Sequence, residues 1–163
     1  NPVCSADGRF VVFKSGRSGS TTLWKVGIDG GAPLQLTNHP SEFPTISPDG
    51  KLIAYSYIEE ASQPSLAIIA IDSGERVKTI NLPGSMQPIA FAWMPDGKAV
   101  AYLDSASGIL NIWSQPIDGG SPKQITDFKE MLITGFAWSR DGKQLACTRG
   151  NLLRDAILIT DLK

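Results

Sequence analysis

Short apolar runs, each preceded by a turn-forming tetrapeptide, recur four times along the chain. The clearest copy is residues 47–55, Ser-Pro-Asp-Gly-Lys-Leu-Ile-Ala-Tyr. Serine opens such a turn, proline presets φ at the second position and glycine closes it, so the pattern predicts a type I turn. The following run is short, apolar and partly β-branched or aromatic, which indicates a buried strand.

The turn aspartates place the copies at a steady interval. Successive aspartates lie 42, 47 and 45 residues apart. A period in the forties with short strands is typical of an array of small sheets rather than of one continuous core. Each carboxylate is expected to cap its own turn through main-chain amides, which makes these positions structural. They are Asp7, Asp49, Asp96 and Asp141.

Further strand patterns follow each turn. An alternation of apolar and polar residues begins at Leu23, Leu66 and Ile112, and an outer element repeats as Pro-x-Gln-Leu/Ile-Thr at 33–37 and 122–126. With the strand that leads into each turn, every copy has four antiparallel strands, which is the blade of an all-β propeller. We expect four blades of four strands, the last without its outer strand, at approximately 1–38, 43–82, 88–128 and 134–163.

Repeated residues suggest how the blades would pack. Ala or Val stands just before the aromatic position of every copy, where a small side chain lets neighbouring sheets approach closely. Cys4 and Cys147 occupy positions held by apolar residues in the other copies, so both are predicted to be small buried hydrophobes. A disulfide across the seam between the first and last blades is the alternative. Inter-blade packing is also predicted for Trp24, Trp93, Trp113 and Trp138.

The turn-and-strand unit, followed by Ile-Asp-Gly-Gly-x-Pro-x-Gln-Leu-Thr at 28–37, resembles the TolB-type, WD-repeat-like propeller repeat over essentially the whole chain. The resemblance implies a docking or sensing module, since this fold serves many proteins. Such propellers usually have more than four blades, which implies a partial propeller or half of a ring closed by two copies. Residues 148–161 also resemble the C-terminal end of bacterial receptor-like serine/threonine kinases, which implies an extracytoplasmic sensor.

Composition narrows the possible partners. The net charge is −1 and the isoelectric point about 5.8, so nothing favours nucleic acid or an anionic membrane surface. The longest apolar run, 67–71, is far shorter than the ~20 residues of a membrane helix, and no membrane contact by this segment is expected. The chain begins with Asn1, so we expect a processed chain or a fragment. The compartment is not fixed by the sequence, although the resemblance favours a periplasmic or extracytoplasmic one.

The chain offers little for catalysis. Its single histidine, His39, lies in Asn-His-Pro-Ser and is expected to be a turn residue. Residues 16–20 only superficially resemble the serine elbow Gly-x-Ser-x-Gly, and no Gly-Lys pair is followed by Ser or Thr as in a phosphate-binding loop. No Cys-x-x-Cys, calcium loop or dinucleotide motif is present. We therefore predict no catalytic residue, cofactor or metal in this chain.

Two sets of irregular connections are expected to emerge together at one end of the propeller, here called the loop face, opposite the Asp-Gly turns of the turn face. They join second to third strands, at 15–21, 57–64, 104–108 and 149–155, and blade to blade, at 38–43, 81–88 and 127–134. Variable loops on a rigid scaffold commonly carry binding residues, and their mixed charges suit a protein or peptide. The candidates are Arg17, His39, Glu42, Tyr57, Glu59, Glu60, Gln87, Asp104, Lys129, Met131, Arg149 and Arg154.

Three functions compete at this stage. The first is a non-catalytic scaffold for protein interaction or ligand sensing, as the sensor of a serine/threonine kinase. The second is a propeller that gates a prolyl-oligopeptidase-like or tricorn-like serine peptidase. The third is the propeller of a transcriptional regulator or of a Tol-type envelope protein. Self-association that completes the ring is compatible with each.

Overall fold

The computed structural model describes residues 2–57, 65–82, 90–105, 109–139 and 141–151, and within them every regular element is a strand. These strands form three four-stranded sheets and one two-stranded sheet, each built from consecutive strands. All described pairings are antiparallel. No helix long and apolar enough to cross a membrane occurs in this part of the chain. The predicted all-β class, with one sheet per repeat, is confirmed.

The strand bounds follow the repeat, and we number the sheets as blades 1 to 4. Blade 1 contains β1 (Val3–Cys4), β2 (Phe10–Ser15), β3 (Thr22–Gly27) and β4 (Gly30–Gln35). Blade 2 contains β5 (Ser41–Ile46), β6 (Leu52–Tyr57), β7 (Ser65–Ala70) and β8 (Arg76–Asn81). Blade 3 contains β9 (Phe91–Trp93), β10 (Ala99–Asp104), β11 (Asn111–Pro116) and β12 (Lys123–Gln124). Blade 4 contains β13 (Leu132–Trp138) and β14 (Leu145–Gly150), and the rest of the predicted fourth blade, residues 152–163, lies outside the described residues.

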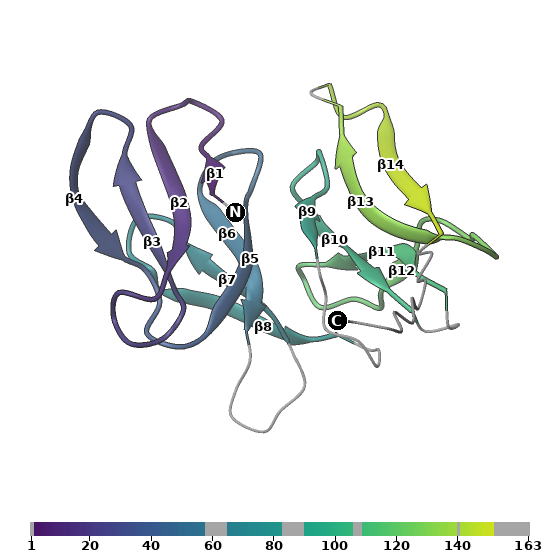
Figure 1. The fold of residues 1–163 in the computed structure, drawn as a ribbon, viewed down its shortest axis with the longest axis horizontal. Coiled ribbons are helices and arrows are strands. Elements are labelled where there is room, and N and C mark those ends of the chain that lie inside the picture. The colour runs from purple at the N-terminus through teal and green to yellow at the C-terminus, as the bar shows by residue number, and fades with distance from the viewer. Residues whose placement is uncertain (1, 58–64, 83–89, 106–108, 140, 152–163) are drawn as a thin grey trace, which may run out of the picture.

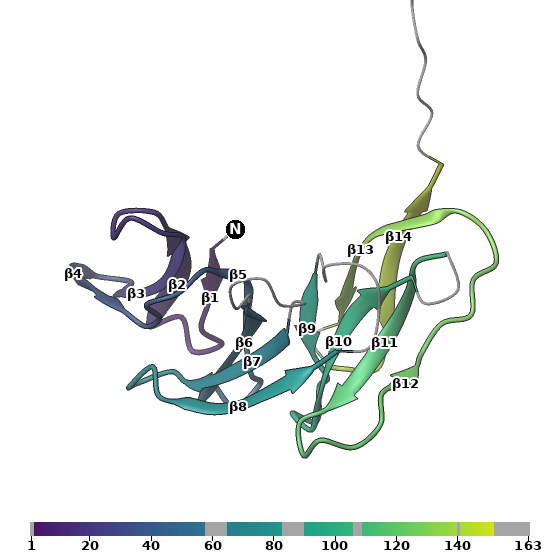
Figure 2. The same ribbon diagram turned by 90° about the horizontal axis from the view of Figure 1, so that it is seen from below.

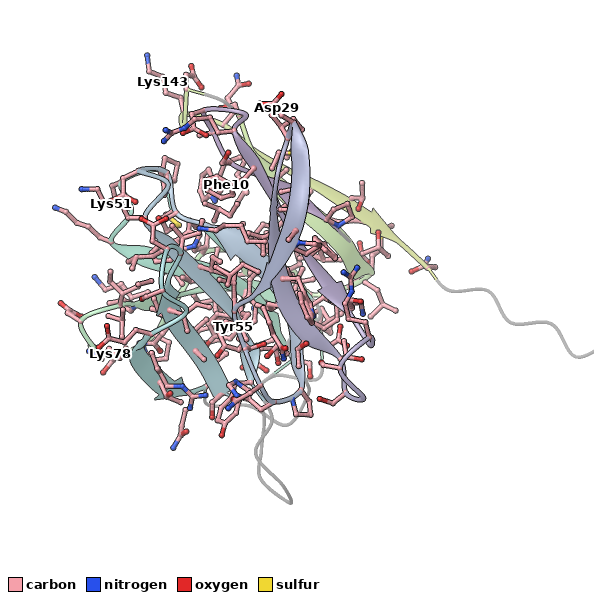
Figure 3. All side chains as sticks on the ribbon, turned by 90° about the vertical axis from the view of Figure 1, so that its left-hand side faces the viewer. Phe10, Asp29, Lys51, Tyr55, Lys78 and Lys143 are labelled. Carbon is pink, nitrogen blue, oxygen red and sulfur yellow. The ribbon has the colours of Figure 1, made fainter. Side chains whose placement is uncertain are left out.

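The blades stand side by side along an arc, in the order of the sequence (Figures 1 and 2). Figure 2 shows β1, β5, β9 and β13 on the inner side of the arc, with β4, β8 and β12 on the outer side. The turns after the first strand of each blade gather at one end, where Figure 3 labels Lys51 and Lys143. This arrangement is that of a β-propeller, with the irregular connections at the opposite end.

Each Asp-Gly turn is closed by its own aspartate. In blade 2 the Ser47 hydroxyl and the Lys51 main-chain N–H donate to Asp49 Oδ1, at 2.6 and 3.1 Å. The Gly50 N–H donates to the Ser47 carbonyl at 2.9 Å, and Gly50 adopts a φ of 73°, a conformation that favours glycine. The Ser47 hydroxyl, followed by the Lys51 amide, holds the pKa of Asp49 below its usual value. In blade 3 Met94 replaces the serine, and Asp96 keeps only its main-chain bond.

The sheets pack through the small residue that the repeat places before the aromatic position. Val12, Ala54 and Ala101 are fully buried, and each belongs to the core between its own blade and the next. Ala146, the equivalent residue of blade 4, is exposed, because no described element follows to cover it. The predicted close approach of neighbouring blades is thus confirmed at the three seams that the structure describes.

Two packing predictions need correction at the ends of the arc. Both cysteines are free, and Cys4 is exposed rather than buried, because β1 is a two-residue edge strand. Cys147 is partly buried against the core between blades 3 and 4. Trp93 and Trp113 pack at the seam of blades 2 and 3 as predicted. Trp24 does not pack at a seam described here, and the Arg17 guanidinium lies over its ring at 4.9 Å.

The repeat offers a matched pair of variants for the seam. We expect Ala54→Leu to lower the free energy of unfolding by about 1–3 kcal/mol, because the added carbons have no room between blades 2 and 3. Ala146→Leu, at the equivalent exposed position, should change it by less than about 0.5 kcal/mol. Urea unfolding followed by tryptophan fluorescence measures both. Equal effects would contradict the seam packing.

Candidate functional site

The loop face is where we place the candidate site, and the structure describes eight of its twelve predicted residues. Of these, the loop between blades 1 and 2 brings His39 and Tyr57 together, with ring centroids 4.5 Å apart in an edge-to-face arrangement. A second group of predicted residues, Lys129, Met131 and Arg149, lies at the connection between blades 3 and 4, where Arg149 donates to the Glu130 carbonyl. Glu59, Glu60, Gln87 and Arg154 lie outside the described residues.

His39 is the centre of a cluster of polar and aromatic side chains. Its Nε2 lies 3.1 Å from the Tyr55 hydroxyl and 3.0 Å from an Arg76 guanidinium nitrogen, and its Nδ1 lies 3.0 Å from Asn38 Oδ1. The Arg76 guanidinium also stacks over the Tyr57 ring at 4.2 Å. Both neighbours of Nε2 are donors and Asn38 Oδ1 is an acceptor, so the contacts fit a neutral imidazole protonated at Nδ1.

The surroundings of His39 resist a second proton. Burial, and then the positive charge of Arg76, lower the pKa of His39 below its usual value. A proton on Nε2 would also place two N–H groups against each other where Arg76 now donates. The ring is therefore held neutral, with Nε2 as an acceptor.

A pocket of about 460 Å³ opens beside this cluster at the seam between blades 1 and 2. Its apolar floor includes Leu36 and Ile69, and Arg76 stands at one wall. At Gly74 the backbones of the two blades meet so closely that an added Cβ would lie 2.5 Å from the Leu36 carbonyl oxygen. The remaining lining residues are Gln35, Thr37, Asn38 and His39.

A second hollow, of about 300 Å³, lies among the inner strands and includes Phe43, Val3 and Phe91. Lys14 and Glu42, which also line it, form an ion pair. Phe43 adopts a φ of 52°, unusual for a bulky residue, and its side chain is 38% exposed. Such a conformation costs on the order of 1–3 kcal/mol. The surrounding structure therefore holds an aromatic side chain at the surface against a backbone preference.

The remaining predicted residues near blade 4 have mixed environments. The Arg149 guanidinium stacks over the Phe128 ring at 3.8 Å and donates to the Glu130 carbonyl at 2.8 Å. Lys129 is exposed and pairs with Asp127. Met131 has a φ of 62° and is 42% exposed, which makes it the second non-glycine residue with positive φ among those described.

Asp104 differs from the expected exposed loop residue. It ends β10 and is only 4% exposed, and burial raises its pKa. Burial, and then the nearby Asp104 charge, raise the pKa of Tyr102 to about 12. The Tyr102 hydroxyl has no hydrogen-bond partner among the described residues. No group of three metal-ligating side chains occurs in this part of the chain.

Sequence reasoning missed Tyr55, Arg76 and Phe43. Tyr55 appeared to be only the aromatic residue of the repeat, and Arg76 lies on an outer strand rather than in a loop. By strand pairing, Gln35, Thr79 and Gln124 are equivalent, so the residues that correspond to Arg76 are Ala32 in blade 1 and Ser121 in blade 3. A departure from the repeat at a single position indicates a local role that the other blades lack.

Known proteins support the assignment of the fold. The TolB homologue of Chlorobium luteolum is 27% identical over 161 residues, which cover 97% of this chain and 35% of the relative. TolB of Acinetobacter baumannii matches in structure with a TM-score of 0.78 and 21% identity, over 90% of this chain and 36% of that one. The fold is a TolB-like β-propeller. No family model matches the sequence.

A relative with another name also matches this chain in sequence. Dipeptidyl-peptidase 5 of Porphyromonas endodontalis is 28% identical over 142 residues, which cover 77% of this chain but 20% of the peptidase. This TolB-like chain thus spans about a fifth to a third of the length of three curated relatives that it matches.

The single histidine allows a clean pH test of the cluster. The pKa of His39 is lowered on folding, so the unfolded chain binds the proton more readily. The stability that neutral His39 supports is fully present above its unfolded pKa of about 6.5 and is lost as pH falls through the folded value. We expect the urea midpoint of the native chain to decline from pH 7.5 to 5.0 more steeply than that of His39→Gln. Parallel profiles would contradict the cluster.

Proposed function

We propose that this chain is a non-catalytic propeller scaffold that binds a protein or peptide through its loop face. The observation that carries the proposal is the pair of non-glycine residues with positive φ, Phe43 and Met131. Phe43 lies at the irregularity in β5 and Met131 in the connection before β13, and both display apolar side chains, at 38% and 42% exposure. Unfavourable backbone conformations are retained where the side chain has a use, and large exposed hydrophobic residues are frequent anchors of protein interfaces.

The polar groups around these residues suit the same kind of partner. Lys14 and Glu42 beside Phe43, and the exposed Lys129 beside Met131, give the loop face both signs of charge. A polyanion would favour a surface of one sign, whereas a protein interface combines an apolar centre with a mixed polar rim. TolB-like propellers are protein-interaction domains, which also fits a protein partner.

Peptide display tests this choice of face. Random peptides selected on the native chain should bind at least about tenfold more weakly to Phe43→Asn, because the aromatic anchor is lost while asparagine tolerates positive φ. Lys51→Ala and Lys143→Ala, at the turn face shown in Figure 3, serve as controls and should leave binding unchanged. Peptides that depend on the lysines and ignore Phe43 would overturn the proposal.

A second candidate is the propeller of a serine peptidase, and its support is the similarity to dipeptidyl-peptidase 5. In that case the nucleophile would belong to another domain, and the propeller would control access. The kinase-sensor prediction depends on residues 148–161 alone, whereas the relatives reported above are TolB proteins and a peptidase. A hydrolase domain encoded next to this segment would favour the peptidase function, a kinase domain with a membrane helix the sensor, and a winged helix the regulator.

Self-association that completes the ring is a further proposal for the same chain. Val11 and Phe13 correspond to Ile53 and Tyr55, which are fully buried against the preceding blade, yet both are partly exposed. Such an apolar face can be covered by a second copy. Light scattering at increasing concentration should show a dimer, and a stable monomer throughout would contradict this proposal.

A further inference from the structure

The strongest unassigned feature is the pocket between the end of β4 and the β7–β8 turn. We propose that it binds a carboxylate group of the partner peptide, with the Arg76 guanidinium as the anion-binding group. This inference rests on the proposed function, since it names one chemical group that the scaffold would recognise.

A bulge in blade 2 directs Arg76 into this pocket. Along the pairing of β7 with β8, Ile68 faces Lys78 but Ile69 faces Arg76, so β8 contains one extra residue at this point. The extra residue interrupts the pattern in which successive side chains of a strand point to opposite faces of the sheet. Arg76 consequently reaches His39 on the side of blade 1, while the Lys78 amine lies 3.3 Å from the Cβ position of Gly119 in blade 3.

The Arg76 guanidinium is held in place but retains free donors. One terminal nitrogen donates to His39 Nε2 at 3.0 Å, and the plane of the group stacks on Tyr57. The Tyr55 and Tyr57 hydroxyls also engage the guanidinium. A guanidinium has five N–H donors in a fixed fork, so the donors that these contacts leave open can meet the oxygens of a carboxylate. Because stacking and the bond to His39 already restrict the side chain, less entropy is lost on binding.

Charge around the pocket favours an anion. The ion pairs among the described residues involve Arg9, Lys14, Lys25 and Lys129, and none involves Arg76. His39 is neutral and does not repel an anion, and Asn38 and Gln35 add amide groups to the wall of the pocket. The apolar floor of Leu36 and Ile69 can accept the carbon atoms that carry the carboxylate.

The test uses three short peptides in a ¹H–¹⁵N NMR titration of the full chain. They are acetyl-Gly-Gly-Ala with a free C-terminal carboxylate, its C-terminal amide, and acetyl-Gly-Asp-Gly amide. We expect the two carboxylate peptides to bind at least about fivefold more tightly than the amide and to shift the Arg76 Nε–H and Gly74 signals. The tighter of the two tells whether a chain terminus or an acidic side chain is the natural source.

Matched variants separate a specific contact from general attraction. Arg76→Gln should weaken carboxylate binding about fivefold or more, whereas Lys78→Gln, the same loss of charge on the same strand, should change it less than twofold. Arg76→Lys, which keeps the charge without the fork, should give an intermediate loss. Spectra unchanged away from the pocket establish that each variant is folded. Equal weakening by the two glutamine variants, or equal binding of the amide, would overturn the inference.

The last part of the experiment concerns acidic residues of the chain itself. Glu59 and Glu60 follow Tyr57 in the sequence and lie outside the described residues. If the double variant Glu59→Gln/Glu60→Gln binds the carboxylate peptides with unchanged affinity, the proposal is supported. If its affinity for them rises tenfold or more, a carboxylate of the chain itself occupies Arg76, and the proposal is overturned. If the native chain binds no carboxylate peptide but still binds peptides that depend on Phe43, this inference is wrong and the proposed scaffold function still holds.

Discussion

The central sheets, blades 2 and 3, are apolar on both faces, and only a neighbouring sheet can cover each face. The fully buried residues of blade 2 show the constraint directly, because Tyr55 packs toward blade 1 and Ala54 toward blade 3. The small side chain of Ala54 lets Tyr102, the aromatic residue of the following blade, approach closely. Radial order therefore follows from the alternation of residues along a single strand, repeated at each copy of the turn.

This constraint leaves few places for function. Residues on both faces of the central strands pack in the seams between blades, and the aspartates of the turn face hydrogen-bond within their own turns. What remains is the loop face and the outer rim, where the strands diverge and a pocket can open between blades. Of the two described non-glycine residues with positive φ, Met131 lies in the connection from blade 3 to blade 4, and Phe43 lies at the irregularity in β5, just after the connection from blade 1.

The sequence predicted the scaffold far better than the site. The spacing of the Asp-Gly turns was enough to predict the order of the strands in each sheet, because each turn fixes where a hairpin forms. The cluster at His39 could not be predicted in the same way, since it joins residues from a linker, a second strand and an outer strand. The contribution of Arg76 depends on a bulge, which shifts the facing of one residue and leaves no periodic signal. Cys4 was placed wrongly because a repeat position does not reveal whether a neighbour covers it.

Comparison of equivalent positions separates structural contacts from the specialised one. Tyr57 meets the ring of His39, and Arg149, at the same position of blade 4, stacks on Phe128, which corresponds to His39. A contact that recurs with different residues stabilises the link between blades and needs no ligand to explain it. Arg76 has no such counterpart, because the corresponding residues of the other outer elements are Ala32 and Ser121. A guanidinium in place of these small residues adds charge and hydrogen-bond donors to the wall of the pocket, and this departure from the repeat is what distinguishes the pocket as a site for recognition.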